Sequence, residues 1–187
     1  VGIYNGKSAQ ICFADAPGLI RAKKGLNRFL AHEFSDVISE SDVLLAVLAL
    51  DEKKPELLRE VADLVHSTGK PWAIVITKTD LPLKHRHSIL RDLLAGYDVP
   101  KFWVSALTKQ SELKEMILPC LAEKLPLSPG PLFPLELYTP HSLRDLVTEY
   151  IREQCFVHLH QEIPFNLAVR LRSFDENSGK KVRLEAD

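Results

Sequence analysis

Two long apolar runs constrain the fold of this chain more than any other feature. They read VLLAVLAL over residues 43–50 and WAIVIT over residues 72–77. A strand that is apolar on both faces has to be covered on both faces, as strands of parallel sheets are. Stretches with helical spacing separate these runs from other strand-like runs. This alternation predicts right-handed β-α-β units and an α/β fold with a doubly wound parallel sheet.

The same periodicity predicts the other elements of this region. Strands are expected near residues 2–5, 9–14, 43–50, 72–77 and 101–105, and helices over 25–39, 55–68, 86–95 and 111–124. Only the first two strands are expected to be antiparallel. Asn5-Gly6 between two apolar runs is a strong hairpin signal, because the type I′ turn that it favours needs φ > 0 at both central residues.

Gly6-Lys7-Ser8 also ends like a phosphate-binding loop. Such a loop reads G-x-x-x-x-G-K-S/T and leads into a helix whose N-terminal amides face the phosphates. The first glycine should then stand at position 1, which is Val1, and the residues after Ser8 have the character of a strand. We therefore interpret Gly6-Lys7-Ser8 as a hairpin turn.

A proline-rich stretch divides the chain. PLSPGPLFP, residues 126–134, contains four prolines and a glycine, which is typical of a linker. We place domains at 1–125 and 138–187, with the linker over 126–137. Beyond it, residues 141–163 have apolar side chains at helical spacing, and the strand-like runs FNLAVRLRSF and KKVRLEAD follow.

Composition excludes several classes of protein. The net charge is −1, so any surface for nucleic acid has to be local. The three cysteines are far apart and odd in number, which argues against a disulfide framework and for a reducing compartment. The longest apolar run has eight residues, too few to span a membrane, and no signal peptide is expected.

Three short motifs follow apolar strands, at the edge where open parallel sheets bind ligands. They are Asp15-Ala16-Pro17-Gly18, Thr77-Lys78-Thr79-Asp80 and Ser105-Ala106-Leu107. Asp15 is suited to hold Mg²⁺ through water, and Gly18 lets a backbone N–H approach a terminal phosphate. The Asp80 carboxylate can accept two parallel hydrogen bonds from guanine, a donor pair that adenine lacks. The Lys78 stem can lie along the base plane, and a backbone N–H of the third motif can meet guanine O6.

Each motif alone has a simpler explanation. The first can be only a turn, the second only a helix N-terminus with Thr79 or Asp80 as its cap, and the third carries little information. Their order, spacing and common position at strand ends together indicate a guanine nucleotide site.

With these motifs the chain resembles the Era-type GTPases, which join a Ras-like P-loop NTPase-type domain to a KH RNA-binding domain. The motifs are similar to that family's D-T-P-G, N-K-x-D and S-A-x, and residues 143–174 resemble its entry into the KH domain. The resemblance implies a set of GTP-binding residues, with Asp15 as a water-mediated Mg²⁺ ligand and no catalytic side chain assigned. The set is Asp15, Ala16, Pro17, Gly18, Leu19, Thr77, Lys78, Thr79, Asp80, Ser105, Ala106 and Leu107.

The chain also departs from this family. It contains no phosphate loop, no switch threonine and no first strand, which the family places between the strand ending at Ala14 and the strand at 43–50. It ends before the G-x-x-G loop of a KH domain. Thr77 stands where the family has asparagine, and a hydroxyl cannot reproduce the two-ended hydrogen bonding of a carboxamide. Leu19 replaces the water-positioning glutamine of Ras-like enzymes, as in other Era-type proteins. We expect a partial chain, inactive alone, of a working GTPase.

The resemblance implies GTP binding and hydrolysis, with Mg²⁺ and GTP/GDP, coupled to binding of small-subunit ribosomal RNA and the small ribosomal subunit during ribosome assembly. It implies a cytoplasmic monomer, leaves room for peripheral contact with the inner face of the cell membrane, and suggests no DNA partner. The alternative is a nucleotide-independent RNA- or ribosome-binding module, a degenerate GTPase without turnover.

RNA contacts are predicted in the last part of the chain, although a solvated sheet face explains the same residues equally well. These residues are Arg170, Arg172, Lys180, Lys181 and Arg183.

Overall fold

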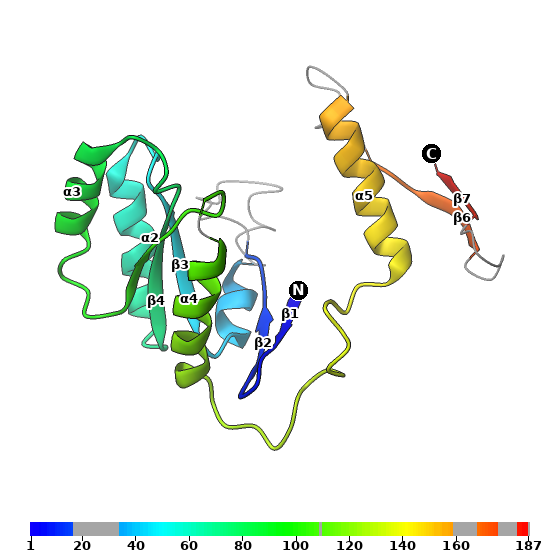
Figure 1. Ribbon diagram of the computed structural model, residues 1–187, viewed down its shortest axis with the longest axis horizontal. Helices are drawn as coiled ribbons and strands as arrows, with labels where there is room; N and C mark the ends of the chain where they lie inside the picture. Colours follow the sequence, from blue (N-terminus) through cyan, green and yellow to red (C-terminus); the bar gives the residue numbers. More distant parts are fainter. Residues whose placement is uncertain (17–33, 109, 159–167, 176–182, 187) are drawn as a thin grey trace. The chain divides into compact units, whose positions relative to one another are not determined.

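The computed structural model describes residues 1–16, 34–108, 110–158, 168–175 and 183–186 (Figure 1). It divides into two compact units. One is Gly2–Tyr138, and the other is Thr139–Asp187 together with Val1.

The first unit alternates strands and helices, as the sequence predicts. Its strands are β1 (Gly2–Asn5), β2 (Gln10–Phe13), β3 (Leu44–Ala49), β4 (Trp72–Thr77) and β5 (Lys101–Trp103). Its helices are α2 (Pro55–Ser67), α3 (Lys84–Leu93) and α4 (Gln110–Lys124), and residues 34–40 are also helical.

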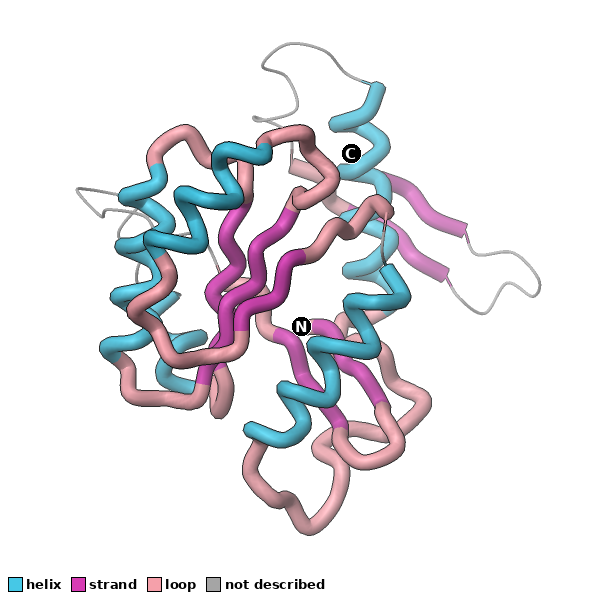
Figure 2. Tube along the Cα trace, turned by 60° about the vertical axis from the view of Figure 1, so that its left-hand side comes forward, coloured by secondary structure: helices cyan, strands magenta, loops and turns pink. Residues whose placement is uncertain are grey.

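Strands β3, β4 and β5 form a parallel sheet in that order, so the predicted parallel α/β arrangement is confirmed. Helices α2 and α3 cover one face of this sheet, and α4 covers the other (Figures 1 and 2). The sheet therefore lies between two helical layers.

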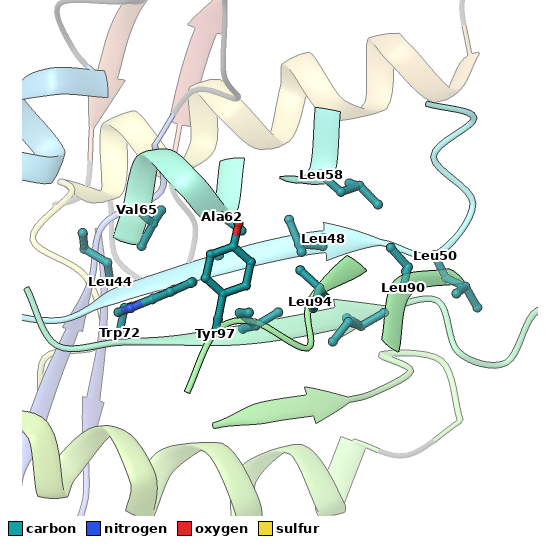
Figure 3. Packing of buried hydrophobic residues seen from close by; sticks show 13 residues of the cluster. Leu44, Leu48, Leu50, Leu58, Ala62, Val65, Trp72, Leu90, Leu94 and Tyr97 are labelled. Atoms are coloured by element: carbon teal, nitrogen blue, oxygen red, sulfur yellow. The ribbon is translucent and has the colours of Figure 1, made fainter. Parts of the chain in front are cut away.

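Strand β4 separates two apolar clusters. Trp72, Ile74 and Ile76 join the cluster under α2 and α3, whose packing Figure 3 shows. Ala73 and Val75 point the other way and join the cluster under α4. Burial on both faces is what a continuously apolar strand predicts.

Strand β3 is covered less completely than its sequence predicts. In the described part of the chain it pairs with β4 only, which leaves its other edge without a strand. Ala46 and Leu48 are buried on the α2 side, but Val47 on the opposite face is 59% exposed. The prediction that 43–50 is covered on both faces is therefore wrong at Val47, because α4 packs over β4 and β5 instead.

The opening hairpin is present, but its turn differs from the predicted one. β1 and β2 pair antiparallel with Asn5 opposite Gln10, and the connection spans residues 6–9. The backbone N–H of Gly6 donates to Ala9 O at 2.9 Å. Asn5 and Gly6 are not among the described residues with positive φ, so the type I′ turn is wrong. A four-residue connection does not need that conformation.

The side chains of Asn5 and Gln10 bind the backbone of the proline-rich region. Asn5 Nδ2 donates to Leu135 O at 2.8 Å and to Leu137 O at 3.2 Å. Gln10 Nε2 donates to Phe133 O at 2.9 Å, and Phe133 N–H donates back to Gln10 Oε1 at 2.9 Å. Gln10 Nε2 also donates to Asn5 Oδ1 at 2.7 Å, which orients both amides.

The backbone of β1 adds another contact. Ile3 N–H donates to Tyr138 O at 2.8 Å. We call residues 133–138 the strap. Its hydrogen bonds show that the C-terminal part of the proline-rich region is docked on the hairpin.

The second unit contains α5 (Leu143–His158) and the antiparallel strands β6 (Leu171–Asp175) and β7 (Arg183–Ala186). Arg144 of α5 donates a hydrogen bond to Leu171 O of β6. A helix followed by two strands agrees with the sequence, although β6 begins later than the run FNLAVRLRSF suggests. No side chain of α5 is buried within the described residues.

The strap contacts lead to a first prediction. Gln10→Ala removes three side-chain hydrogen bonds at the strap and at Asn5. Each is worth about 1 kcal/mol net, and 1.4 kcal/mol is a factor of about ten in an opening equilibrium. Hydrogen exchange of the Phe133 amide, which donates to Gln10, should therefore become at least about tenfold faster. Ser8→Ala, in the exposed turn, is the matched control. Equal exchange in the two variants would contradict the docking role of Gln10.

Candidate functional site

The parallel register brings the carboxyl ends of the sheet strands to one edge. Ala49 of β3 pairs with Thr77 of β4, so the loops after these strands begin side by side. Lys78 and Asp80 follow β4, and Ser105 follows β5. The second and third predicted motifs are thus brought together, as the spacing of the strands suggests.

Ser105 holds the carboxylate of Asp80. Its side chain is 1% exposed, and its hydroxyl donates to Asp80 Oδ1 at 2.5 Å. Ser105 Oγ also accepts hydrogen bonds from the N–H groups of Leu107, at 3.2 Å, and Thr108, at 3.3 Å. One oxygen of Asp80 is fixed in this way. Among the described residues no protein group donates to the other, Oδ2.

Lys78 has two unusual features. Its backbone φ is 61°, in the left-handed region that non-glycine residues rarely adopt. Its ammonium lies 2.8 Å from Asp51 Oδ2, with both side chains partly exposed. The hydrogen bond from Lys78 holds the pKa of Asp51 below its usual value, and the nearby positive charge of Arg86 acts in the same direction.

Thr77 is half-buried at the end of β4. Its hydroxyl donates to Leu48 O of β3 at 3.4 Å, and its carbonyl accepts a hydrogen bond from Leu50 N–H at 3.1 Å. The residue that replaces the expected asparagine thus bonds to the neighbouring strand through both groups. Thr79, also half-buried, donates its N–H to Val104 O at 3.2 Å.

The third motif is exposed beyond its serine. Ala106 and Leu107 are exposed, and Leu107 is 85% exposed. The Leu107 amide already donates to Ser105 Oγ. It is therefore not the N–H expected to meet guanine O6.

The first motif is described only in part. Asp15 is exposed and Ala16 is half-buried after β2, which belongs to the hairpin sheet. Pro17, Gly18 and Leu19 lie outside the described residues. An exposed carboxylate at the end of a strand fits a Mg²⁺ ion held through water, so Asp15 can supply one such contact.

No group of three or more His, Cys, Asp or Glu side chains within the described ranges could hold a metal ion directly. His85 and His87 lie on α3, where the His87 ring stacks on Trp103 with centroids 5.0 Å apart. A search of the described helices for a membrane-spanning segment found none that is long and apolar enough.

Comparison with known proteins places this arrangement in context. No family model matches the chain. The chain is 32% identical over 189 residues to the GTPase Era of Geotalea daltonii and 29% identical over 195 residues to that of Nitratidesulfovibrio vulgaris strain Miyazaki F. These matches cover 99% and 97% of this chain, and 62% and 61% of the relatives. The chain thus spans about three fifths of their length.

A solved structure agrees in fold. It is that of a point variant of Aquifex aeolicus Era bound to GDP.AlF4⁻, with a TM-score of 0.83 at 24% identity, over 99% of this chain and 64% of that one. The fold is therefore that of the Ras-like, P-loop NTPase-type class, with its doubly wound parallel sheet. Within that class, the chain is a relative of the GTPase Era proteins.

Sequence reasoning missed two parts of the site. It assigned no role to Asp51, although a carboxylate that follows a buried parallel strand is a recognisable signal of a ligand-binding edge. It assigned the Ser105 loop a backbone contact only, whereas the structure uses the Ser105 hydroxyl to hold Asp80. That contact joins residues 25 positions apart and depends on the register of β4 and β5.

Ser105 gives the second prediction. Ser105→Ala removes a hydrogen bond to a charged group and leaves two amides without their acceptor. The free energy of unfolding should fall by about 1–3 kcal/mol, measured by urea unfolding. Ser88→Ala on the exposed side of α3 should change it by less than about 0.5 kcal/mol. Equal stability of the two variants would show that the Ser105 network contributes nothing.

Proposed function

We propose that the whole protein containing this chain is a GTPase whose nucleotide cycle is coupled to small-subunit ribosomal RNA binding during ribosome assembly. The observation that carries the nucleotide part is the Asp80 carboxylate, held by the buried Ser105 hydroxyl at the carboxyl edge of a parallel sheet. The names of the relatives and the GDP.AlF4⁻ bound to the structural neighbour support the nucleotide part only.

Base recognition follows from the fixed position of Asp80. Guanine offers two parallel donors, N1–H and the exocyclic amine, that match the two oxygens of a carboxylate. Asp80 Oδ1 accepts one hydrogen bond from Ser105 and has a second lone pair that can accept another. No group among the described residues donates to Oδ2, so it can accept a hydrogen bond from the base. Adenine presents an acceptor at N1, so the carboxylate rejects it. Lys78, two residues before Asp80, brings an aliphatic stem to the same edge.

Phosphate chemistry depends on the first motif and on parts of the whole protein beyond this chain. Asp15 would contact Mg²⁺ through water, and the backbone of Gly18 would contact the γ-phosphate. Bound Mg²⁺ would neutralise phosphate charge during in-line attack by water. We propose that the open edge of β3 receives a further strand in the whole protein, followed by the phosphate-binding loop.

RNA binding is proposed for the second unit, as the start of a KH-type domain. Arg170, just before β6, and Arg172, within it, are both exposed, and their positive charges suit contact with phosphate groups. Arg183 lies in β7, and Lys180 and Lys181 lie outside the described residues. We propose the small ribosomal subunit as the partner, a cytoplasmic location and peripheral membrane contact.

Thr77 keeps a second candidate function open, a ribosome-binding module without turnover. The Thr77 hydroxyl bonds to Leu48 O of β3, so it is not directed to a bound base in the way that an asparagine amide would be. Weaker guanine binding from this substitution would favour the module.

The base assignment gives the third prediction. In the whole protein, Asp80→Asn replaces one acceptor oxygen by a donor, which matches the carbonyl of xanthine and not the amine of guanine. Loss of a charge-assisted hydrogen bond costs about 1.5–3 kcal/mol, so affinity for GTP should fall at least about tenfold while affinity for XTP rises. Fluorescent-nucleotide titrations with GTP, XTP and ATP measure both effects.

Thr77→Asn is the matched control. It should preserve the preference for guanine and tighten GTP binding, because the carboxamide restores two-ended hydrogen bonding. If Asp80→Asn binds GTP as tightly as the parent protein, the guanine site is wrong. Asp80 is not the cap of the following helix, because the N-cap of α3 is Leu83.

Turnover separates the two candidate functions and gives the fourth prediction. Purified residues 1–187 should release no phosphate from GTP above the buffer rate, because none of their sequence motifs wraps the β-phosphate. The whole protein should release phosphate steadily with Mg²⁺ present. Phosphate release by the isolated chain would overturn the phosphate-loop argument, and a whole protein without turnover would support the binding module.

A further inference from the structure

Asp51 lies at the carboxyl edge of the parallel sheet, where the guanine site is proposed, but it has no role in the chemistry proposed above. Its carboxylate Oδ2 lies 2.8 Å from the Lys78 ammonium, and their side chains are 39% and 54% exposed. Exposed ion pairs of this kind contribute little to folding stability, because water screens them and both side chains lose conformational freedom. Stability therefore does not explain the pair.

The backbone on both sides of Asp51 is fixed to the sheet. Leu50 N–H donates to Thr77 O at 3.1 Å, and Glu52 N–H donates to Ala49 O at 3.1 Å. Leu50 is itself only 1% exposed. Asp51 thus projects from a turn whose two neighbours are both hydrogen-bonded in place.

Arg86 of α3 also binds the backbone of this turn. Its guanidinium donates to Leu50 O at 3.4 Å and also to Glu52 O. Both carbonyls that flank Asp51 are thereby occupied. A carboxylate on a turn held in this way is a rigid anchor point.

Lys78, by contrast, needs an anchor. Its left-handed backbone is set by the loop, in which Leu81 N–H donates to Lys78 O at 3.2 Å. Its side chain is long and loses more rotamer freedom on being fixed than most side chains do. A nucleotide that had to order this side chain would bind less tightly, since ordering cost is subtracted from affinity.

We propose that Asp51 is a positioning residue for nucleotide binding, which holds the Lys78 ammonium so that the aliphatic stem is already extended along the edge where the base lies. This inference rests on the guanine site proposed above and adds a residue to it.

A double-mutant cycle in the whole protein tests the inference, with fluorescent GDP and GTP as probes. Asp51→Asn should raise the Kd for both nucleotides about threefold to tenfold, a typical coupling for side chains in direct contact. Asp51→Glu should recover part of the loss. In a Lys78→Ala background, Asp51→Asn should have no further effect. Thermal unfolding should be nearly unchanged in Asp51→Asn.

Glu56→Gln, an exposed carboxylate in the first turn of α2, is the matched control for loss of one negative charge, and its affinity should equal that of the parent. If Lys78→Ala weakens binding and Asp51→Asn leaves it unchanged or tightens it, the positioning role is overturned while the guanine site stands. If Lys78→Ala also leaves binding unchanged, the guanine site itself fails. Equal losses in the Asp51 and Glu56 variants would reduce the effect to net charge and overturn the inference.

Discussion

The candidate site depends on one constraint, the enclosure of strand β4. This strand is buried on both faces and paired on both edges, so neither it nor its neighbours can shift register without exposing a large apolar area. Because the register is fixed, the starting positions of the loops that follow the strands are fixed as well. The contact between Ser105 and Asp80 and the contact between Asp51 and Lys78 each join two different strand ends. The core beneath them therefore fixes the backbone from which these side chains extend.

Much of this arrangement could be predicted from the sequence because it depends on local patterns. Apolar runs, helical spacing and the clustering of proline specify where strands and helices form, and parallel pairing then brings the strand ends together. The guanine motif at Thr77–Asp80 could be placed for the same reason. The exposure of Val47 could not, because it depends on how far α4 extends over the sheet.

Contacts between residues far apart in the sequence could not be predicted from local sequence patterns. The neighbouring Gly6 predicts a turn at Asn5, yet the Asn5 amide binds Leu135, 130 residues away. An asparagine is favoured in both situations, for αL tolerance in the first and for its two-ended amide in the second. Composition similarly predicts a linker over residues 126–137. Proline-rich backbone carries free carbonyls, which makes it equally suited to accept such amide contacts.

The open edge that β3 presents within the described residues has a consequence for handling the chain in isolation. Its row of backbone N–H and C=O groups, beside the exposed Val47, can pair with a strand of another molecule. Proteins usually protect such edges with charged side chains, proline or a covering element, and β3 itself, LLAVLA, contains neither charge nor proline. Residues 1–187 in isolation are therefore expected to self-associate through this edge as their concentration rises.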